Sequence, residues 1–313
     1  MVIKGYNVGS LLKRTGKEIL ADGVPTLAAQ TAYYFFFSLF PLLLFLTPLL
    51  SVVGERDQVM QFVMAQLQSL VQGDAVRPFA EAIANIVYAK NAPGLMSVGA
   101  LLAAWSGSNI FGSLMTALNT AYDVEESRPW WKRQLLRLGV FIVAAIIMVL
   151  ATLTILAGED IIDRVGMLLG LGHTGRSTWK LVQFPLAFAF LVALGFIIYY
   201  VLPNVKQDWK KVLVASAAMT GLWIVATLGF RMYIQYFPPN PTYGLIGGVI
   251  ILLTWMYYSM FVVLSGGELA AELHHGTGAA EPETGAVYYG RIVSDGTPDT
   301  SSVARTKRAR DAR

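Results

Sequence analysis

The most restrictive feature of this sequence is a charge-free run of thirty-two residues, Gly23–Gly54. At about 1.5 Å per residue, a helix of this length exceeds the roughly 30 Å hydrocarbon core of a bilayer. A soluble protein would have to cover such a helix on all sides, whereas lipid covers it directly. The run therefore predicts a first membrane span at about residues 26–53.

Further long apolar runs predict an all-α polytopic membrane protein with six transmembrane helices. Only 14% of the 313 residues are charged, whereas soluble domains have about 25%. The membrane domain is expected to cover residues 23–275, with an N-terminal segment at 1–22 and a disordered tail at 276–313. After the first span, the others are expected at about 95–121, 138–157, 181–202, 212–235 and 243–267.

Additional amphipathic helices are expected at the membrane surface. Residues 55–90 and 158–180 have apolar side chains at helical spacing but are too polar to span a bilayer. Residues 1–22 place lysines beside an apolar stripe, which predicts a helix lying on the inner surface. This segment has no apolar run followed by a cleavage site, so we expect no cleaved signal peptide.

The distribution of basic residues predicts the orientation. With six spans, seventeen lysines and arginines lie on the side of both termini and six lie on the other side. Basic residues accumulate on the cytoplasmic side of membrane proteins. We therefore expect a multi-pass protein of the bacterial cytoplasmic (inner) membrane with both termini in the cytoplasm.

The first span contains an unusual polar face. Gln30, Pro41 and Pro48 share one helical face, with Tyr34 and Phe37 close to it. Each proline frees a backbone carbonyl one turn earlier, and lipid cannot satisfy such a group. The face should therefore contact protein or water. Two interpretations remain open, a kinked helix packed against its neighbours and a helix that lines a cavity.

A polar stripe also follows the second span. Asn109, Ser113, Thr116 and Asn119 recur at helical spacing. Such side chains bond neighbouring membrane helices together, and they can also line a polar pathway. The sequence leaves both interpretations open.

Two charged positions lie within or at the edge of the spans. Arg231 falls near the predicted outer interface, where it could extend to the headgroups or contact an anion inside the bundle. Glu268 and Glu272 end the sixth span one helical turn apart. They are expected to pair with cytoplasmic lysines or face water, with a proton- or cation-coupling role as the alternative.

Several function classes lack their signatures. The chain has no cysteine and only three histidines, which excludes thiol chemistry and gives no metal-ligand cluster. Nucleotide-binding, metalloprotease and serine-hydrolase motifs are also absent. We therefore expect no enzyme, catalytic residue, metal or cofactor, and no specific nucleic-acid partner. Membrane lipids are the expected partners.

A set of short motifs is spread over most of the chain, between about Ile19 and Leu273. They are Asp22-Gly23, Ala28-Ala29, Tyr33-Tyr34, Ser38-Leu39-Phe40-Pro41, Asn119, Tyr122-Asp123, Arg128-Pro129-Trp130, Leu202-Pro203-Asn204, Tyr243-Gly244, Gly247, Trp255 and Gly266-Gly267-Glu268-Leu269. In these residues the chain resembles the YihY/virulence factor BrkB family of bacterial inner-membrane proteins. The resemblance implies a six-span helical bundle, while ribonuclease, virulence and transport descriptions have all been attached to the family. No established catalytic residues transfer from it to this sequence.

Two functional hypotheses follow. The polar stripes favour a transporter or exporter of an amphiphile, an envelope lipid or a small solute. The alternative is a non-transporting scaffold or envelope-assembly factor that binds a partner through residues 57–90. Ribonuclease activity is not supported by the residues. The substrate, the energy coupling and the oligomeric state are not encoded in any recognisable pattern.

Overall fold

The computed structural model describes residues 2–3, 6–53, 92–156, 172–236 and 244–275, with isolated residues between 60 and 84. A minimal antiparallel pair, β1 (Val2–Ile3) and β2 (Tyr6–Asn7), precedes the helices. The helices of the described part are α1 (Val8–Ala21), α2 (Val24–Val53), α5 (Ala92–Ala121), α6 (Trp130–Leu156), α8 (Gly172–Val201), α9 (Trp209–Tyr236) and α10 (Gly244–His275).

The helical membrane architecture is confirmed in its main features. Five of the described helices are long and apolar enough to cross a membrane, namely α5, α6, α8, α9 and α10. The first predicted span forms α2, a continuous helix of 30 residues. The predicted helices at 55–90, most of the segment 158–180 and the tail at 276–313 lie outside the described residues.

Two helices begin eight or nine residues earlier than the sequence predicted. The third span was expected from residue 138 after a loop, but α6 starts at Trp130, directly after Pro129, which fits the preference of proline for helix starts. Residues 172–180 were assigned to an interfacial segment, yet they form the first turns of α8. Helix α8 is continuous to Val201 and contains Pro185 in its interior.

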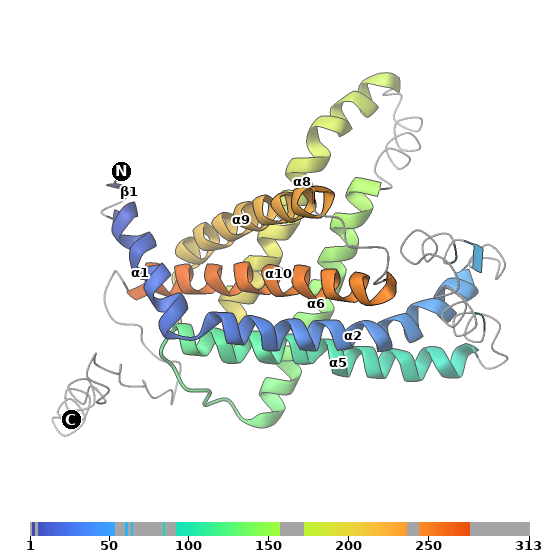
Figure 1. Cartoon of the computed structure of the whole chain (residues 1–313), viewed down its shortest axis with the longest axis horizontal. Helices are drawn as coiled ribbons and strands as arrows, with labels where there is room; N and C mark the ends of the chain where they lie inside the picture. The colour runs from blue at the N-terminus through green and yellow to red at the C-terminus, as the bar shows by residue number, and fades with distance from the viewer. Residues whose placement is uncertain are drawn as a thin grey trace.

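Three helices lie side by side along the long axis of the molecule. Figure 1 shows α2, α5 and α10 running together, while α6 and α8 cross them steeply. Helix α9 packs between α10 and α8. The short helix α1 packs against the C-terminal part of α10. Both ends of the described chain therefore meet at one end of the bundle, here called the terminal end.

The core depends on close helix approach near that end. A Cβ atom on Gly266 would collide with the Tyr199 hydroxyl, and one on Gly267 would collide with Leu118. Both partners are fully buried aromatic or aliphatic side chains. Small residues allow membrane helices to approach in this way. The paired glycines therefore fix α10 against α8 and α5.

The turn between α1 and α2 requires a specific residue. Gly23 adopts φ of 64°, in the left-handed region that glycine enters without penalty. The Gly23 N–H donates to the Leu20 carbonyl, and the Asp22 N–H donates to the Glu18 carbonyl. Helix α1 thus ends at Ala21, within the N-terminal segment expected at residues 1–22, and the turn places Glu18 and Asp22 beside the start of α2.

Candidate functional site

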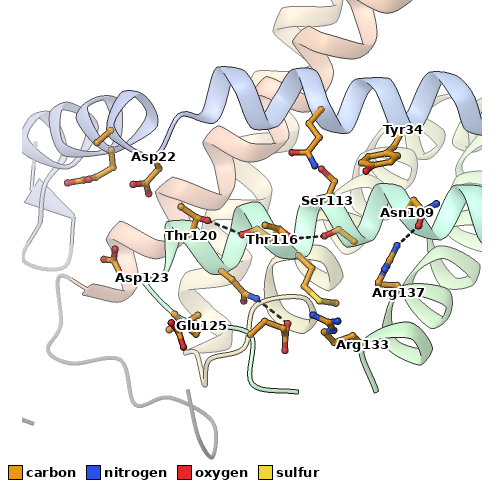
Figure 2. Close-up of a pocket in the computed structure, with 18 residues that line it drawn as sticks. Asp22, Tyr34, Asn109, Ser113, Thr116, Thr120, Asp123, Glu125, Arg133 and Arg137 are labelled. Atoms are coloured by element: carbon orange, nitrogen blue, oxygen red, sulfur yellow. Dashed lines mark hydrogen bonds between the residues drawn. The ribbon is translucent and has the colours of Figure 1, made fainter. Parts of the chain in front are cut away.

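A polar cavity of about 950 Å³ lies between α2, α5 and α6. It is partly open, and its polar lining extends from the terminal end along the helices (Figure 2). The lining comprises Glu18, Ala21, Asp22, Gln30, Tyr34, Asn109, Gly112, Ser113, Met115, Thr116, Asn119, Thr120, Asp123, Val124, Glu125, Glu126, Arg133 and Arg137.

The cavity reaches roughly halfway along the helices. Tyr34 lies ten residues after the first residue of α2, which corresponds to about 15 Å of helix. Asn109 lies twelve residues before the end of α5, which corresponds to about 18 Å. A bilayer core is roughly 30 Å thick. The cavity is therefore deep enough to bring polar groups near the middle of a membrane.

Beyond this depth, α2 and α5 close the space by direct backbone contact. A Cβ atom on Gly99 would lie 2.8 Å from the backbone nitrogen of Phe45 and 2.9 Å from the carbonyl carbon of Leu44. Only a glycine at position 99 allows the two helices to meet this closely. The two helices thus meet directly at a position further along than the lining residues Tyr34 and Asn109.

The structure brings together most of the polar residues singled out in the sequence. Gln30 and Tyr34 of α2 face Asn109, Ser113, Thr116 and Asn119 of α5 across the cavity. Gln30 and Thr116 are exposed, whereas Ser113 and Asn119 are buried. The buried face of α2 is a different one, formed by Val24, Ala28, Thr31, Ala32 and Ser38.

Some of these residues also bond the helices together. The hydroxyl groups of Thr31 and Ser113 lie 2.8 Å apart in a buried contact between α2 and α5. Asn119 donates to a Glu126 carboxylate oxygen at 3.1 Å and accepts the backbone N–H of Asn204 at 2.8 Å. In contrast, the Thr116 hydroxyl donates to the Gly112 carbonyl of its own helix. The stripe on α5 therefore combines interhelix bonding with a cavity-facing surface.

Two other candidates lie away from the cavity. Pro41 lies further along α2, and Arg231 is exposed in α9, near the end of that helix opposite the terminal end. Neither contributes to the cavity lining. The side chain of Pro48, a third candidate, lies outside the described residues.

The environment of the Glu268 side chain differs from the sequence-based expectation, which was that it would pair with lysines or face water. It is only 2% exposed and Glu272 is 8% exposed. Together with Glu18, Asp22, Asp123 and His275 they surround a small second pocket. Within the described part of the chain, no lysine or arginine forms an ion pair with Glu268. The helix α1 covers these carboxylates, because it packs on the end of α10.

Two arginines line the cavity that the sequence had not predicted as site residues; they were counted only among the basic residues that indicate the cytoplasmic side. Arg133 and Arg137 lie one turn apart in the first part of α6 and face the cavity. The Arg137 guanidinium donates to the Asn109 Oδ1 atom and, at 3.3 Å, to the Ser108 carbonyl. The sequence contained a signal for this arrangement. Arg133 and Arg137 are four residues apart, so both lie on one face of a helix that begins at Trp130.

A network of polar groups lies at the terminal end, beside the cavity residues Glu125 and Glu126. Glu126 and Arg128 form an ion pair at 2.7 Å, and Arg128 also donates to the Leu202 carbonyl at 2.6 Å. The Asn204 side chain donates to the Glu125 carbonyl and to the Ser127 hydroxyl. These bonds join the α5–α6 connection to the α8–α9 connection.

The electrostatics of Glu126 follow from this network. Burial alone would raise the pKa of its carboxyl group, but the hydrogen bonds and the charge of Arg128 outweigh burial. A smaller contribution comes from the Asn119 hydrogen bond. Together they hold the pKa of Glu126 below its ordinary value of 4.5, so the carboxylate is ionised at neutral pH.

Comparison with known proteins places these features in a family. The family model described as virulence factor BrkB matches residues 15–287. The ribonuclease-like protein YfkH of Bacillus subtilis is 30% identical over 253 residues, which cover 79% of this chain and 89% of the relative. The UPF0761 membrane protein VP0125 of Vibrio parahaemolyticus is 27% identical over 263 residues, covering 82% and 80% of the two chains.

A third relative is longer. The UPF0761 membrane protein RC1_0578 of Rhodospirillum centenum is 27% identical over 252 residues, and the match spans 79% of this chain but 53% of that protein. No solved structure matches the chain. The match across residues 15–287 includes every described helix from the middle of α1 to α10. The chain therefore belongs to the BrkB family of membrane proteins.

Proposed function

We propose that this protein is a transporter of an amphiphile, an envelope lipid or a small solute, and that the cavity between α2, α5 and α6 receives the substrate. The observation that supports this proposal is the cavity itself. It places amide and hydroxyl side chains about halfway along α2 and α5, together with two arginines from the first turns of α6, in helices that are otherwise apolar. Polar groups at this depth are expensive in a membrane and usually mark a pathway.

The proposal includes a membrane orientation with α2 as a sixth span and both termini in the cytoplasm. Exposed Trp131 and Trp209 lie at the first turns of α6 and α9, at the terminal end of the bundle. Lys132 and Lys210 lie 5.5 and 5.6 Å from the centres of these rings. Tryptophan and lysine at helix ends are typical of the headgroup region. In this orientation the cavity opens to the cytoplasm and the Gly99 contact closes it towards the outside.

We also propose that RNA cleavage is not the function, although one relative is named ribonuclease-like. Metal-dependent nucleases hold their ions with clustered carboxylates and histidines. Among the described residues, no group of three or more such side chains is arranged to hold a metal ion. The carboxylates around Glu268 instead surround a space of only about 10 Å³.

Reconstitution into liposomes tests transport directly. The purified protein is assayed for scrambling of fluorescent phospholipids and for uptake of labelled small anions and cations, beside protein-free liposomes. We expect flux of at least one probe class. Absence of flux for the whole panel, with the protein shown to be folded by circular dichroism, would contradict the proposal.

A further inference from the structure

Arg133 and Arg137 form a concentration of positive charge inside the cavity. Both side chains are half-buried, and the positive charge of Arg133 acts on Arg137. Like charges one helical turn apart destabilise a helix. Within the described residues, Glu126 forms its ion pair with Arg128, and no carboxylate forms an ion pair with Arg133 or Arg137. Their charge is therefore not neutralised by the described protein.

Neutral groups hold Arg137 in a fixed position. Its guanidinium donates to the Asn109 Oδ1 atom and to the Ser108 carbonyl, both on α5. A Cβ atom at position 112 would lie 2.5 Å from the guanidinium carbon, so Gly112 supplies the space in which the group lies. These contacts orient the guanidinium without cancelling its charge and leave further N–H donors for a ligand.

Three carboxylates of the cavity lie apart from Arg137. Figure 2 shows Asp22, Asp123 and Glu125 at one end of the view, and Arg137 with Asn109 and Tyr34 at the other. Arg133 lies between the two ends. Tyr34 of α2 lines the cavity near the arginines and adds a hydroxyl that can donate to an anion.

We infer that Arg133 and Arg137 form a binding site for a phosphate group. This inference rests on the proposed transport function and names the class of substrate. Guanidinium groups bind phosphate oxygens through paired N–H donors, and two adjacent cations match the charge of a phosphate at neutral pH. The Tyr34 hydroxyl is placed to complete the site. The phosphate belongs either to a lipid headgroup or to a free solute, because both present the same oxygens to the arginines.

Binding measurements on the full-length protein distinguish these sources. Isothermal titration with inorganic phosphate is carried out on protein in nanodiscs of phosphatidylcholine alone. In a second arm, the nanodiscs contain phosphatidylglycerol, and copurifying phospholipid is quantified by mass spectrometry. A site for a free solute binds inorganic phosphate in the first arm. A lipid site retains phosphatidylglycerol in the second arm, and this retention falls when soluble phosphate is added.

Substitutions assign the binding to the arginines. We expect Arg133→Gln and Arg137→Gln each to weaken binding by at least about tenfold, the loss typical of a charged hydrogen bond. Lys132→Gln makes the same charge change on the same helix, at an exposed position beside Trp131 and outside the cavity, and is expected to retain full binding. Gly112→Ala keeps both arginines but displaces Arg137, so it should weaken binding even if Arg137→Gln fails to fold.

Binding and flux test the phosphate site and the transport function separately. If neither probe binds, or if Lys132→Gln weakens binding as much as Arg133→Gln, the phosphate site is wrong, whatever flux the liposomes show. If binding depends on both arginines but no probe crosses the membrane, the site stands and the transport proposal is wrong.

Discussion

The hydroxyl group of Thr31 on α2 lies 2.8 Å from the hydroxyl group of Ser113 on α5, in a buried contact. The next polar residue of the α5 stripe, Thr116, is instead exposed towards the cavity. One helix face of α5 thus holds two helices together and lines a cavity at the same time. The two interpretations of this stripe are therefore compatible, and substitutions can separate them.

Thr31→Val removes one partner of the buried hydroxyl pair and keeps the shape of the side chain. We expect it to lower the free energy of unfolding by about 1–3 kcal/mol, because the Ser113 hydroxyl loses its partner on α2. Thermal unfolding in detergent measures the loss. Thr152→Val is the matched control, since Thr152 is exposed on α6 and bonds only its own helix. Equal midpoints for the two variants would contradict the interhelix role.

Gly267→Ala introduces a methyl group against Leu118, where the structure has no room for it. Overpacking of this kind typically costs about 1–3 kcal/mol, so the unfolding temperature should fall clearly. Gly248→Ala is made in the same helix at a position with no atom within 4 Å of the new methyl group. Alanine favours a helix over glycine, so the control should unfold at the same or a higher temperature. A stable Gly267→Ala variant would show that α10 is not fixed in this way.

Acidification should weaken the bonding between the α5–α6 connection and the α8–α9 connection. The pKa of Glu126 is below 4.5 in the folded protein, so its contribution to stability is complete above pH 4.5 and is lost as the pH falls through the lowered value. Unfolding temperatures between about pH 7 and 3 measure the effect. Glu126→Gln should lower stability at neutral pH and reduce the acid-dependent loss, whereas Glu125→Gln should retain it. A Glu126→Gln variant with the full acid-dependent loss would contradict this assignment.

Gln30→Leu tests whether the polar surface of α2 serves transport. Gln30 is exposed to the cavity, and exposed substitutions usually change stability by less than about 0.5 kcal/mol. We expect flux in liposomes to fall severalfold while the unfolding temperature stays within the range of Gln235→Leu, an exposed control on α9. Unchanged flux would show that Gln30 is not part of the pathway. An unfolded variant would show that Gln30 is needed for helix packing.

The sequence predicted the helical architecture because bilayer thickness constrains apolar runs directly. Residues 26–53 and 95–121 were expected to span, and α2 and α5 contain both ranges. Helix boundaries in polar sequence were harder to predict. The start of α6 at Trp130 was missed because its first two turns contain basic residues, which resemble a loop in a hydropathy profile.

The cavity was predicted only in part for a related reason. Helical spacing identified Gln30 and Asn109 as polar residues on their own helices, but spacing does not show which faces of different helices meet. Arg137 became part of the site only through its contacts with Asn109 and the space left by Gly112. The burial of Glu268 depends similarly on α1, whose docking onto α10 is a tertiary contact that no local pattern encodes.

The central claim, that substrate passes through the cavity, can be tested by blocking it. The chain contains no cysteine, so Thr116→Cys introduces a single thiol at an exposed position of the cavity lining. Flux of whichever probe the unmodified protein transports is measured in liposomes before and after labelling with a bulky maleimide. Thr152→Cys, exposed on α6 outside the cavity lining, is the control. The account predicts that labelling abolishes flux in Thr116→Cys and leaves Thr152→Cys active; fully labelled Thr116→Cys with intact flux would contradict it.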